Sequence, residues 1–509
     1  MRTPVWLPLL AVAVSAAILV PPSGAETCES LSKLALKDST ITLAATVPGG
    51  ELSLPGVSGN SARQYKELPA FCRVAATLTP TSDSEIKVEV WLPAADWNGK
   101  FQAVGNGGWA GVISYGAMAQ ALRRGYATAS TDTGHTGGSA KFVLGHHEKL
   151  VDFGYRAVHE MTVKSKSIIA AFYGDAPKLS YWNGCSTGGR QGLKEAQQYP
   201  ADFDGIIAGA PANYRTHLQI GQIWTASATL RDPASFIPPS KYPLIHKAVV
   251  EACDALDSVK DGLLENPTRC RFDPKVLECK GEDSPTCLTA PQVEAARKIY
   301  AGAKNPRTGL QIWPGLMPGS ELGWGQTAGG REPIGLAMEY FRYVVFEDEN
   351  WDWKTFNFDT DTARTEKLEY GMNATDPNLK QFVAHGGKLL MYHGWSDQLI
   401  TPVNSINYYK SVMDTMGGPA RTAEFARLFL VPGMGHCGGG EGPNSFDTVA
   451  ALEQWVENGK PPQQMIASHL TNGTADRTRP LCPYPLVATW KGTGSTDTAS
   501  NFMCAAEKK

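Results

Sequence analysis

The chain has 509 residues, which is too long for one ordinary domain and predicts either two domains or one domain with a large insertion. Hydrophobic residues make up 42% of the chain and charged residues 19%, a balance typical of soluble globular proteins. The net charge of -3 gives no electrostatic basis for binding nucleic acid or an anionic membrane.

The N-terminus has the pattern of a signal peptide over residues 1–25. Arg2 supplies a positive charge, an apolar run follows over residues 5–20, and Ser23-Gly24-Ala25 provides small residues for cleavage. A membrane anchor is the alternative, but the run is short and ends at two prolines. We expect cleavage after Ala25 and a secreted or periplasmic protein that has no membrane attachment afterwards.

The first half of the mature chain predicts alternating strands and helices. Residues 86–92 alternate in hydrophobicity as a half-buried strand does. Four short β-prone runs follow at residues 101–104, 126–131, 179–183 and 206–209, and helical patterns occupy residues 155–172 and 187–198. This order predicts an α/β fold with a mostly parallel sheet and helices on both faces.

The pattern stops near Ala212 and resumes late in the chain. Residues 212–380 look irregular, with many Pro, Gly and Trp residues. Strand patterns return at residues 388–393 and 427–431, each followed by a helical pattern, at 402–414 and 445–458. We therefore expect one sheet domain, built from residues 26–211 and 381–509, and an inserted domain over residues 212–380 that is large enough for its own core.

Residues 184–188, Gly-Cys-Ser-Thr-Gly, match the pattern G-x-S-x-G. Such a turn exposes a nucleophilic Ser between a strand and a helix, and its neighbours must be small because the backbone comes close. The pattern lies between a predicted strand and a predicted helix, which is the context that this function requires. Ser186 is therefore the candidate nucleophile of an α/β-hydrolase fold.

A catalytic acid and then a histidine should follow along the chain in this fold. Asp397 comes just after the strand at 388–393, and His436 comes just after the strand at 427–431. Both positions are at the carboxyl ends of strands, where open α/β sheets place their sites. His436 is the candidate general base, and Asp397 is the candidate group that orients it.

The oxyanion of the reaction needs two backbone N–H donors. One candidate is Thr187, which directly follows the nucleophile. The other should come from the earlier glycine-rich segment Gly105-Asn106-Gly107-Gly108, because glycines let an N–H face the site. The sequence leaves open whether Gly107 or Gly108 is the donor.

Ten cysteines, an even number, all lie in the mature chain, which indicates disulfides in an exported protein. Zinc binding is the alternative, but no C-x-x-C pattern is present. Cys185 precedes the candidate nucleophile and Cys437 follows the candidate base, so a disulfide between them would join these two segments. His159-Glu160 begins like the zinc motif H-E-x-x-H, but position 163 is Val, so that motif is not complete.

Together these segments resemble the tannase and feruloyl esterase family. The matching segments are GCSTGG around Ser186, HGWSD ending at Asp397, and PGMGHC ending at Cys437. The resemblance extends over nearly the whole mature chain. It implies a Ser-Asp-His triad with a disulfide between Cys185 and Cys437, and a lid domain over the active site formed by the insertion.

The resemblance also implies the other disulfides and a structural metal ion. The remaining pairs are Cys28 with Cys72, Cys253 with Cys270, Cys279 with Cys287, and Cys482 with Cys504. The metal is Ca²⁺, and its expected ligands are Asp254, Asp257, Asp261 and the backbone carbonyls of Val259 and Leu263. Oxygen donors beside a turn-forming Gly suit this ion, although a solvated acidic turn is the alternative.

The sequence thus predicts a secreted serine esterase that acts through an acyl-enzyme on a small aromatic ester. The resemblance implies feruloyl or galloyl esters. Terephthalate monoesters or other small aromatic esters are the alternative, since the family includes the hydrolase of mono(2-hydroxyethyl) terephthalate. A second alternative is an inactive α/β-hydrolase that binds a ligand. The sequence has only two N-x-S/T glycosylation sequons, at Asn373 and Asn472, and this small number favours a bacterial source.

Overall fold

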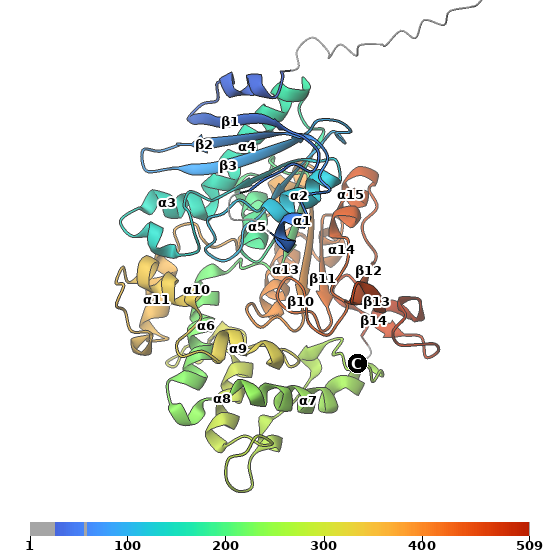
Figure 1. Ribbon diagram of the computed structural model, residues 1–509. Coiled ribbons are helices and arrows are strands. Elements are labelled where there is room, and N and C mark those ends of the chain that lie inside the picture. Colours follow the sequence, from blue (N-terminus) through green and yellow to red (C-terminus); the bar gives the residue numbers. More distant parts are fainter. Residues whose placement is uncertain (1–25, 55–58, 508–509) are drawn as a thin grey trace, which may run out of the picture.

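The computed structural model describes residues 26–54 and 59–507, so the expected signal peptide lies outside the described residues. A nine-stranded sheet forms the centre of the protein (Figure 1), in the order β1-β2-β3-β5-β4-β6-β7-β10-β11. Its strands are β1 (Ser39–Val47), β2 (Phe71–Leu78), β3 (Ile86–Pro93), β4 (Lys100–Val104), β5 (Ala127–Thr131), β6 (Leu179–Cys185), β7 (Gly205–Gly209), β10 (Lys388–Gly394) and β11 (Ala426–Val431).

The direction of the strands divides this sheet into two parts. From β5 to β11 all neighbouring strands are parallel, whereas β1, β2, β3 and β5 pair antiparallel. The seven strands expected from the sequence are all present, and β1 and β2 extend the sheet beyond them. The edge strand β1 has mixed burial and weak hydrophobic alternation, which left it without a clear strand signal in the sequence.

Helices cover both faces of the sheet, as the alternation of strands and helices predicts. Along β10, Leu389 and Met391 point to the core cluster under α4 (Ala157–Tyr173), α5 (Thr187–Gln198) and α13 (Pro402–Met416). Leu390 points to the opposite cluster, which includes α15 (Thr448–Asn458), and α2 (Tyr115–Arg123) packs farther along that face. This two-sided burial confirms the α/β-hydrolase fold class.

The insertion between β7 and β10 is more regular than the sequence indicates. It contains three helices of at least 12 residues, α6 (Arg215–Leu230), α7 (Tyr242–Cys253) and α8 (Ala290–Ala301). Its short elements are β8 (Ala303–Lys304), β9 (Gln311–Trp313), α9 (Gly325–Ala328), α10 (Gly335–Glu339), α11 (Thr360–Lys367) and α12 (Lys380–Ala384). The expectation of irregular structure was wrong here, because Pro lies at the starts of α7 and α8, where it is compatible with a helix.

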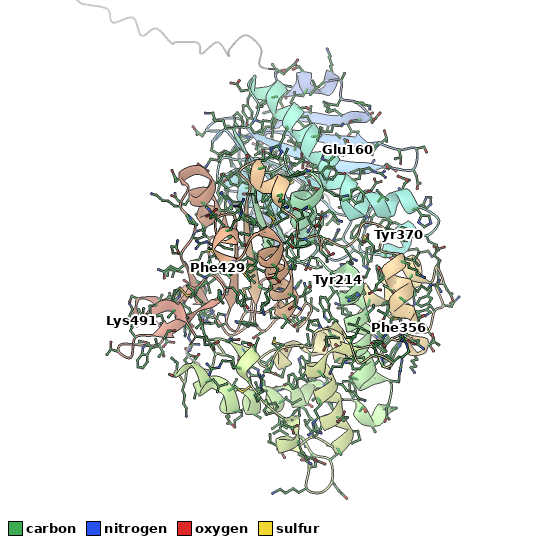
Figure 2. All side chains as sticks on the ribbon, turned by 180° about the vertical axis from the view of Figure 1, so that it is seen from behind. Glu160, Tyr214, Phe356, Tyr370, Phe429 and Lys491 are labelled. Carbon is green, nitrogen blue, oxygen red and sulfur yellow. A yellow bond between two sulfur atoms is a disulfide. The ribbon has the colours of Figure 1, made fainter. Side chains whose placement is uncertain are left out.

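The insertion gathers on one side of the sheet domain (green to yellow in Figure 1). In the view from behind, Tyr214 and Phe356 mark this side and Phe429 marks the sheet domain (Figure 2). One apolar cluster lies within the insertion, and a second joins it to the sheet domain through residues such as Trp109 and Phe153. The insertion therefore has its own core and is also fixed to the sheet domain by shared apolar packing.

The remaining elements extend the sheet domain at both ends. Two antiparallel hairpins complete the C-terminal part, β12 (Met465–Thr471) with β13 (Thr474–Leu481) and β14 (Leu486–Trp490) with β15 (Phe502–Ala506). The short helices are α1 (Asn60–Arg63), α3 (His147–Val151) and α14 (Pro419–Thr422). None of the described helices combines the length and the apolar character that crossing a bilayer requires.

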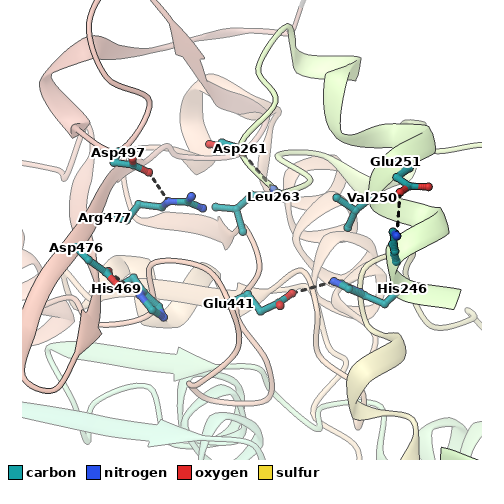
Figure 3. A pocket seen from close by; sticks show the side chains of 12 residues that line it. His246, Val250, Glu251, Asp261, Leu263, Glu441, His469, Asp476, Arg477 and Asp497 are labelled. Atoms are coloured by element: carbon teal, nitrogen blue, oxygen red, sulfur yellow. Dashed lines mark hydrogen bonds and ion pairs between the residues drawn. The ribbon is translucent and has the colours of Figure 1, made fainter. Parts of the chain in front are cut away.

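A charged contact on α7 joins the insertion to the sheet domain. Nδ1 of His246 lies 2.9 Å from the carboxylate of Glu321 within the insertion, and Nε2 lies 2.9 Å from that of Glu441 in the loop beyond β11. Figure 3 shows this contact of His246 with Glu441 in the wall of a pocket of about 640 Å³, whose lining does not include Ser186, Asp397 or His436. Burial alone would lower the pKa of His246, but the hydrogen bonds and charges of the two glutamates raise it to about 9.

This contact makes the stability of the protein depend on pH. The folded pKa of His246 is above the ordinary value of 6.5, so its stabilisation is complete below about pH 6.5 and is lost as the pH rises through about 9. We expect His246→Gln to lower the melting temperature by several degrees at about pH 6 and to have no effect above about pH 9.5. Thermal unfolding of wild type and His246→Gln across this pH range tests the prediction. A difference that does not change with pH would contradict the role of charge.

Candidate active site

Ser186 lies at the sharp turn between β6 and α5. Its φ of 62° and ψ of -120° place a non-glycine residue in a strained conformation. The turn is fixed by its backbone, because the N–H of Ser186 donates to the carbonyl of Gly209 and its own carbonyl accepts from Arg190 and Ala212. The side chain is half-buried at the start of α5, where the helix dipole favours negative charge.

The glycines on both sides of Ser186 are required by close packing. A Cβ on Gly184 would lie 2.5 Å from the carbonyl oxygen of Gly188, and a Cβ on Gly105 would lie 2.6 Å from the Cα of Gly188. Real Cβ atoms do not approach other atoms this closely. The first turn of α5 therefore packs directly on the backbone of β6 and of the glycine-rich loop that follows β4.

Asp397 is fully buried just beyond β10, and all its hydrogen-bonding capacity is used. One carboxylate oxygen accepts the N–H groups of Leu399 (2.8 Å) and Ile400 (2.9 Å). The other lies 2.7 Å from Nδ1 of His436 and 3.0 Å from Nε2 of His393. Burial opposes ionisation, but the charge of His436 and the hydrogen bonds of both histidines outweigh it and hold the pKa of Asp397 well below its usual range.

His393, at the end of β10, is a second histidine on this carboxylate. Its ring is fully buried, and Nε2 also lies 2.8 Å from the carbonyl oxygen of Ile400, so Nε2 carries a proton. Nδ1 is 2.8 Å from the hydroxyl of Ser405 on α13, which can donate to it. His393 therefore supports Asp397 from behind and leaves Nδ1 of His436 as the neighbour on the other side.

The disulfide between Cys185 and Cys437 joins the segments of Ser186 and His436. The two Cα atoms are 6.0 Å apart, although 252 positions separate the cysteines in the sequence. Each cysteine is directly adjacent to a candidate catalytic residue. The covalent bond thus limits how far the turn at Ser186 can move from the loop that carries His436.

The glycine-rich loop after β4 is anchored by one buried side chain, that of Asn106. Its amide group donates to the carbonyls of Val112 and Thr131 and accepts from Gln191 on α5, and its backbone N–H donates to the same glutamine. A loop without regular structure is thereby held against the first turns of α5. This is the position that the oxyanion hypothesis requires for the loop.

Thr187 links this loop to the turn at Ser186. Its hydroxyl donates to the carbonyl oxygen of Gly108 at 3.0 Å and lies 3.4 Å from Nη1 of Arg215. Gly108 has a φ of 54°, and the carbonyl of Gly107 accepts the N–H of Ala110. Among the described residues, the N–H groups of Gly107, Gly108 and Thr187 have no protein acceptor, so all three candidate donors are free to bind an anion.

Two buried arginines lie near Thr187 and the glycine-rich loop, one of them in contact with Thr187. Arg215 stacks 4.5 Å above the ring of Trp109 and lies against Thr187, whereas Arg190 donates to the carbonyls of Phe153 and Gly154. Burial lowers the pKa of Arg215 to about 10 and that of Arg190 to about 9. Within the described chain neither guanidinium forms an ion pair, and Arg215 keeps positive charge close to the place where an oxyanion would develop.

Comparison with known proteins agrees with this geometry. A family model described as "Tannase and feruloyl esterase" matches residues 72–505. The chain belongs to the tannase and feruloyl esterase family. It is 40% identical to an uncharacterized esterase of Xanthomonas campestris pv. campestris, over 97% of this chain and 94% of that protein.

Two solved structures of Aspergillus proteins resemble the chain along nearly all of its length. Feruloyl esterase B from Aspergillus oryzae is 32% identical, with a TM-score of 0.89 over 94% of this chain and 99% of that one. The tannin acyl hydrolase from Aspergillus niger is 25% identical, with a TM-score of 0.76 over 92% of both chains. The chain is a carboxylic ester hydrolase of the tannase and feruloyl esterase family.

Disulfides join all ten cysteines of this family member. Besides Cys185–Cys437, the pairs are Cys28–Cys72, Cys253–Cys270, Cys279–Cys287 and Cys482–Cys504, the same pairs that the sequence resemblance implies. Two of them lie in the insertion, and one joins the C-terminal hairpins. Such a set of disulfides is typical of proteins that fold outside the cytosol.

The acidic loop that follows α7 holds the three expected carboxylate ligands of calcium, but their oxygen atoms do not all lie within 4.8 Å of one another in the described structure. Asp254 accepts the N–H groups of Asp261 and Gly262, and Asp257 accepts that of Val259. Burial, together with the charges of Asp261 and Asp254, raises the pKa of Asp257 to about 6.

Neighbouring groups of this loop also fit an oxygen-binding cation in part. No described residue donates to the carbonyl oxygens of Val259 and Leu263. Arg479 of β13 binds the carboxylate of Asp261, so a cation would share this ligand with a guanidinium. Figure 3 shows Asp261 and Leu263 at the edge of the pocket beside α7.

Sequence reasoning did not identify three residues that shape this site. His393 begins the segment HGWSD that ends at Asp397, but its contact with the Asp397 carboxylate is visible only in the structure. Gln191 binds Asn106 and Arg215 binds Thr187, in each case a residue distant in the sequence, and neither side chain belongs to a motif. Only the glycine-rich segment around Asn106 gave a signal, because glycine-rich loops after strands favour backbone contacts with ligands.

The Thr187 hydroxyl provides a test of how the oxyanion loop is positioned. Thr187→Val removes the hydrogen bond to the Gly108 carbonyl without a large change of volume. We expect kcat on an activated ester to fall about tenfold with little change in KM, less than the loss caused by removing a donor itself. Thr187→Ser keeps the hydroxyl and should retain most of the activity. Equal activity in the Val and Ser variants would exclude a positioning role for this bond.

Proposed function

We propose that Ser186, His436 and Asp397 are the catalytic triad of this esterase. The observation that carries the proposal is the contact of 2.7 Å between Nδ1 of His436 and the fully buried Asp397, on a loop that a disulfide joins to the turn at Ser186. Nδ1 then donates to the carboxylate, so Nε2 is left to act as the base. The strained turn at Ser186 is the arrangement that exposes a nucleophile in this fold.

The proposed reaction has two steps through an acyl-enzyme. Nε2 of His436 takes the hydroxyl proton as Oγ of Ser186 attacks the ester carbonyl, and the proton then passes to the leaving alcohol. Water attacks the acyl-enzyme in the second step, with His436 again as the base. Asp397 keeps the imidazole in its reactive tautomer and stabilises the imidazolium, and it stays ionised because of its lowered pKa.

We propose Thr187 and Gly108 as the oxyanion donors, with Gly107 as the alternative to Gly108. The Thr187 N–H is at the first turn of α5, and Gly108 is held next to it by the Thr187 hydroxyl. The buried Arg215, which contacts Thr187, favours negative charge at this point. No organic cofactor has a role in this mechanism.

We propose small esters of aromatic or phenolic acids, feruloyl or galloyl esters, as the substrates. The names of the related solved enzymes support this choice. The insertion also reaches the site, because a Cβ on Gly108 would meet the Leu336 side chain at 3.0 Å and Trp109 binds the Leu336 carbonyl. Trp109, Phe153 and Tyr340 are fully buried beside this contact and hold it in place, so the choice of an aromatic acid rests on the related enzymes.

An ester panel distinguishes feruloyl and galloyl esters from terephthalate monoesters. We expect wild-type protein to hydrolyse methyl ferulate or methyl gallate faster than mono(2-hydroxyethyl) terephthalate, and Ser186→Ala to lose at least about 10⁴-fold in kcat. Product release is measured by chromatography. Hydrolysis of the terephthalate ester alone would assign the other substrate class. A folded wild type that cleaves none of the three esters would rule out the aromatic-ester assignment and revive a binding function.

We also propose that the acidic loop after α7 holds a structural calcium ion and that the protein is exported to the periplasm or the medium. Asp254, Asp257, Asp261 and the carbonyls of Val259 and Leu263 would supply the ligands, and a bound cation would offset the negative charge that Asp254 and Asp261 place on Asp257. The ion would be structural, because its loop lies in the insertion whereas the proposed triad lies in the sheet domain. The disulfides support the proposed destination.

Removal of calcium tests this site without an activity assay. We expect EGTA to lower the melting temperature of the wild type, and added Ca²⁺ to restore it, because an ion that binds only the folded chain stabilises it. Asp257→Asn should lose this response, whereas Asp273→Asn, a change at an exposed acidic residue outside the loop, should keep it. The site is wrong if calcium affects wild type and Asp257→Asn equally.

A further inference from the structure

A second group of potential metal ligands lies in the sheet domain, away from the triad. It consists of His159 on α4, Glu195 on α5 and Asp202 in the loop after α5, and one ligand atom from each residue lies within 4.8 Å of the other two. Figure 2 shows α4 on the rear of the molecule, where the neighbouring Glu160 is labelled. The group joins two helices and a loop that the triad mechanism does not use.

Glu195 is a buried carboxylate that lacks a hydrogen-bond donor within the described chain. Its side chain is 1% exposed, and neither carboxylate oxygen has a donor among the described residues, since its neighbour at hydrogen-bond distance is another carboxylate, that of Asp202. Burial, and then the charge of Asp202, raise the pKa of Glu195 well above its ordinary value. Two carboxylates that face each other in a buried place need either a shared proton or a cation between them.

His159 adds a nitrogen ligand to the two carboxylates and so completes a group of three potential metal ligands. Its Nδ1 is 2.7 Å from the Asp202 carboxylate, and its ring stacks on Tyr199 at 3.8 Å between centroids, which fixes the ring in place. The nearby ammonium group of Lys166 donates to the backbone carbonyl of Asp202 and forms no ion pair with either carboxylate of the group. One imidazole and two carboxylates are a donor set typical of zinc rather than calcium.

We propose that His159, Glu195 and Asp202 bind one divalent transition-metal ion of the zinc type, with water in the remaining position. The two carboxylates would neutralise the ion, and the ion would satisfy the otherwise unpartnered Glu195. Glu195 is nine residues beyond Ser186, about 13 Å along α5. The ion therefore connects α4 to the far end of the helix that begins at the nucleophile, and it takes no part in the ester chemistry.

No sequence motif reveals this group, although His159 also begins an incomplete metal-binding pattern. His159 and Glu160 begin an incomplete H-E-x-x-H pattern, and Glu160 forms an ion pair with Lys164 instead. The actual partners of His159 are 36 and 43 positions farther along the chain, in other elements. Only the packing of α4 on α5 brings the three side chains together.

Zinc binding by the full mature chain tests the proposal. Protein treated with a chelator is dialysed against Zn²⁺ and its metal content is measured by mass spectrometry, for wild type and for Glu195→Gln. The Gln side chain has the same shape and can donate to Asp202, so this variant is expected to fold. We expect one zinc ion per wild-type chain and an affinity at least about 100-fold lower in the variant, since even indirect partners of a metal contribute 10- to 100-fold.

Two further measurements separate this site from the others proposed. Zinc should raise the melting temperature of wild type and of Asp257→Asn, the variant of the calcium loop, but not of Glu195→Gln. The kcat of wild type should be the same with and without zinc, so a failure of the proposed esterase mechanism would not affect the outcome. Equal zinc uptake by wild type and Glu195→Gln, or none by wild type, would overturn the proposal in favour of a shared proton.

Discussion

Backbone segments approach one another closely around the turn at Ser186, and this contact fixes the arrangement of the candidate site. Gly184, Gly188 and Gly105 lie so near one another that none of them could carry a side chain without displacing the others. This contact places the first turn of α5 directly on the glycine-rich loop after β4. The positions of the nucleophile and of both candidate oxyanion donors follow from it, and the buried Asn106 and Gln191 hold the loop in this arrangement.

The buried charges around the site differ in how they are stabilised. Asp397 is surrounded by four donors, so its carboxylate remains ionised although water is excluded. Arg190 and Arg215 have hydrogen-bond acceptors but no anionic partner within the described chain. Positive charge without a partner is costly in a protein interior, and a negative charge that develops nearby in the reaction would be stabilised by it.

The insertion contacts the candidate site and is fixed to the sheet domain at other points. It meets the glycine-rich loop after β4 through Leu336 and binds the loop beyond β11 through His246 and Glu441. It also carries two disulfides and the acidic loop proposed for calcium. Covalent, ionic and apolar contacts thus hold this segment at several points distant from the candidate site.

The sequence by itself determined the fold class, the parallel strands β4 to β7, β10 and β11, and the segments around Ser186, Asp397 and His436. Hydrophobic periodicity and the small residues of the turn are local properties, and a one-dimensional pattern records them. The insertion was expected to be irregular, and its helices α7 and α8 were missed because the prolines at their starts resemble loop signals.

Only the tertiary structure decided which distant side chains meet. It placed His393 and His436 on one carboxylate, Arg215 beside Thr187, and His159 beside Glu195 and Asp202. None of these contacts leaves a periodic trace, since each depends on how two separate elements pack. Local sequence specifies which way a side chain points along its own strand or helix, whereas the partner it meets is set by the packing of the whole sheet and its helices.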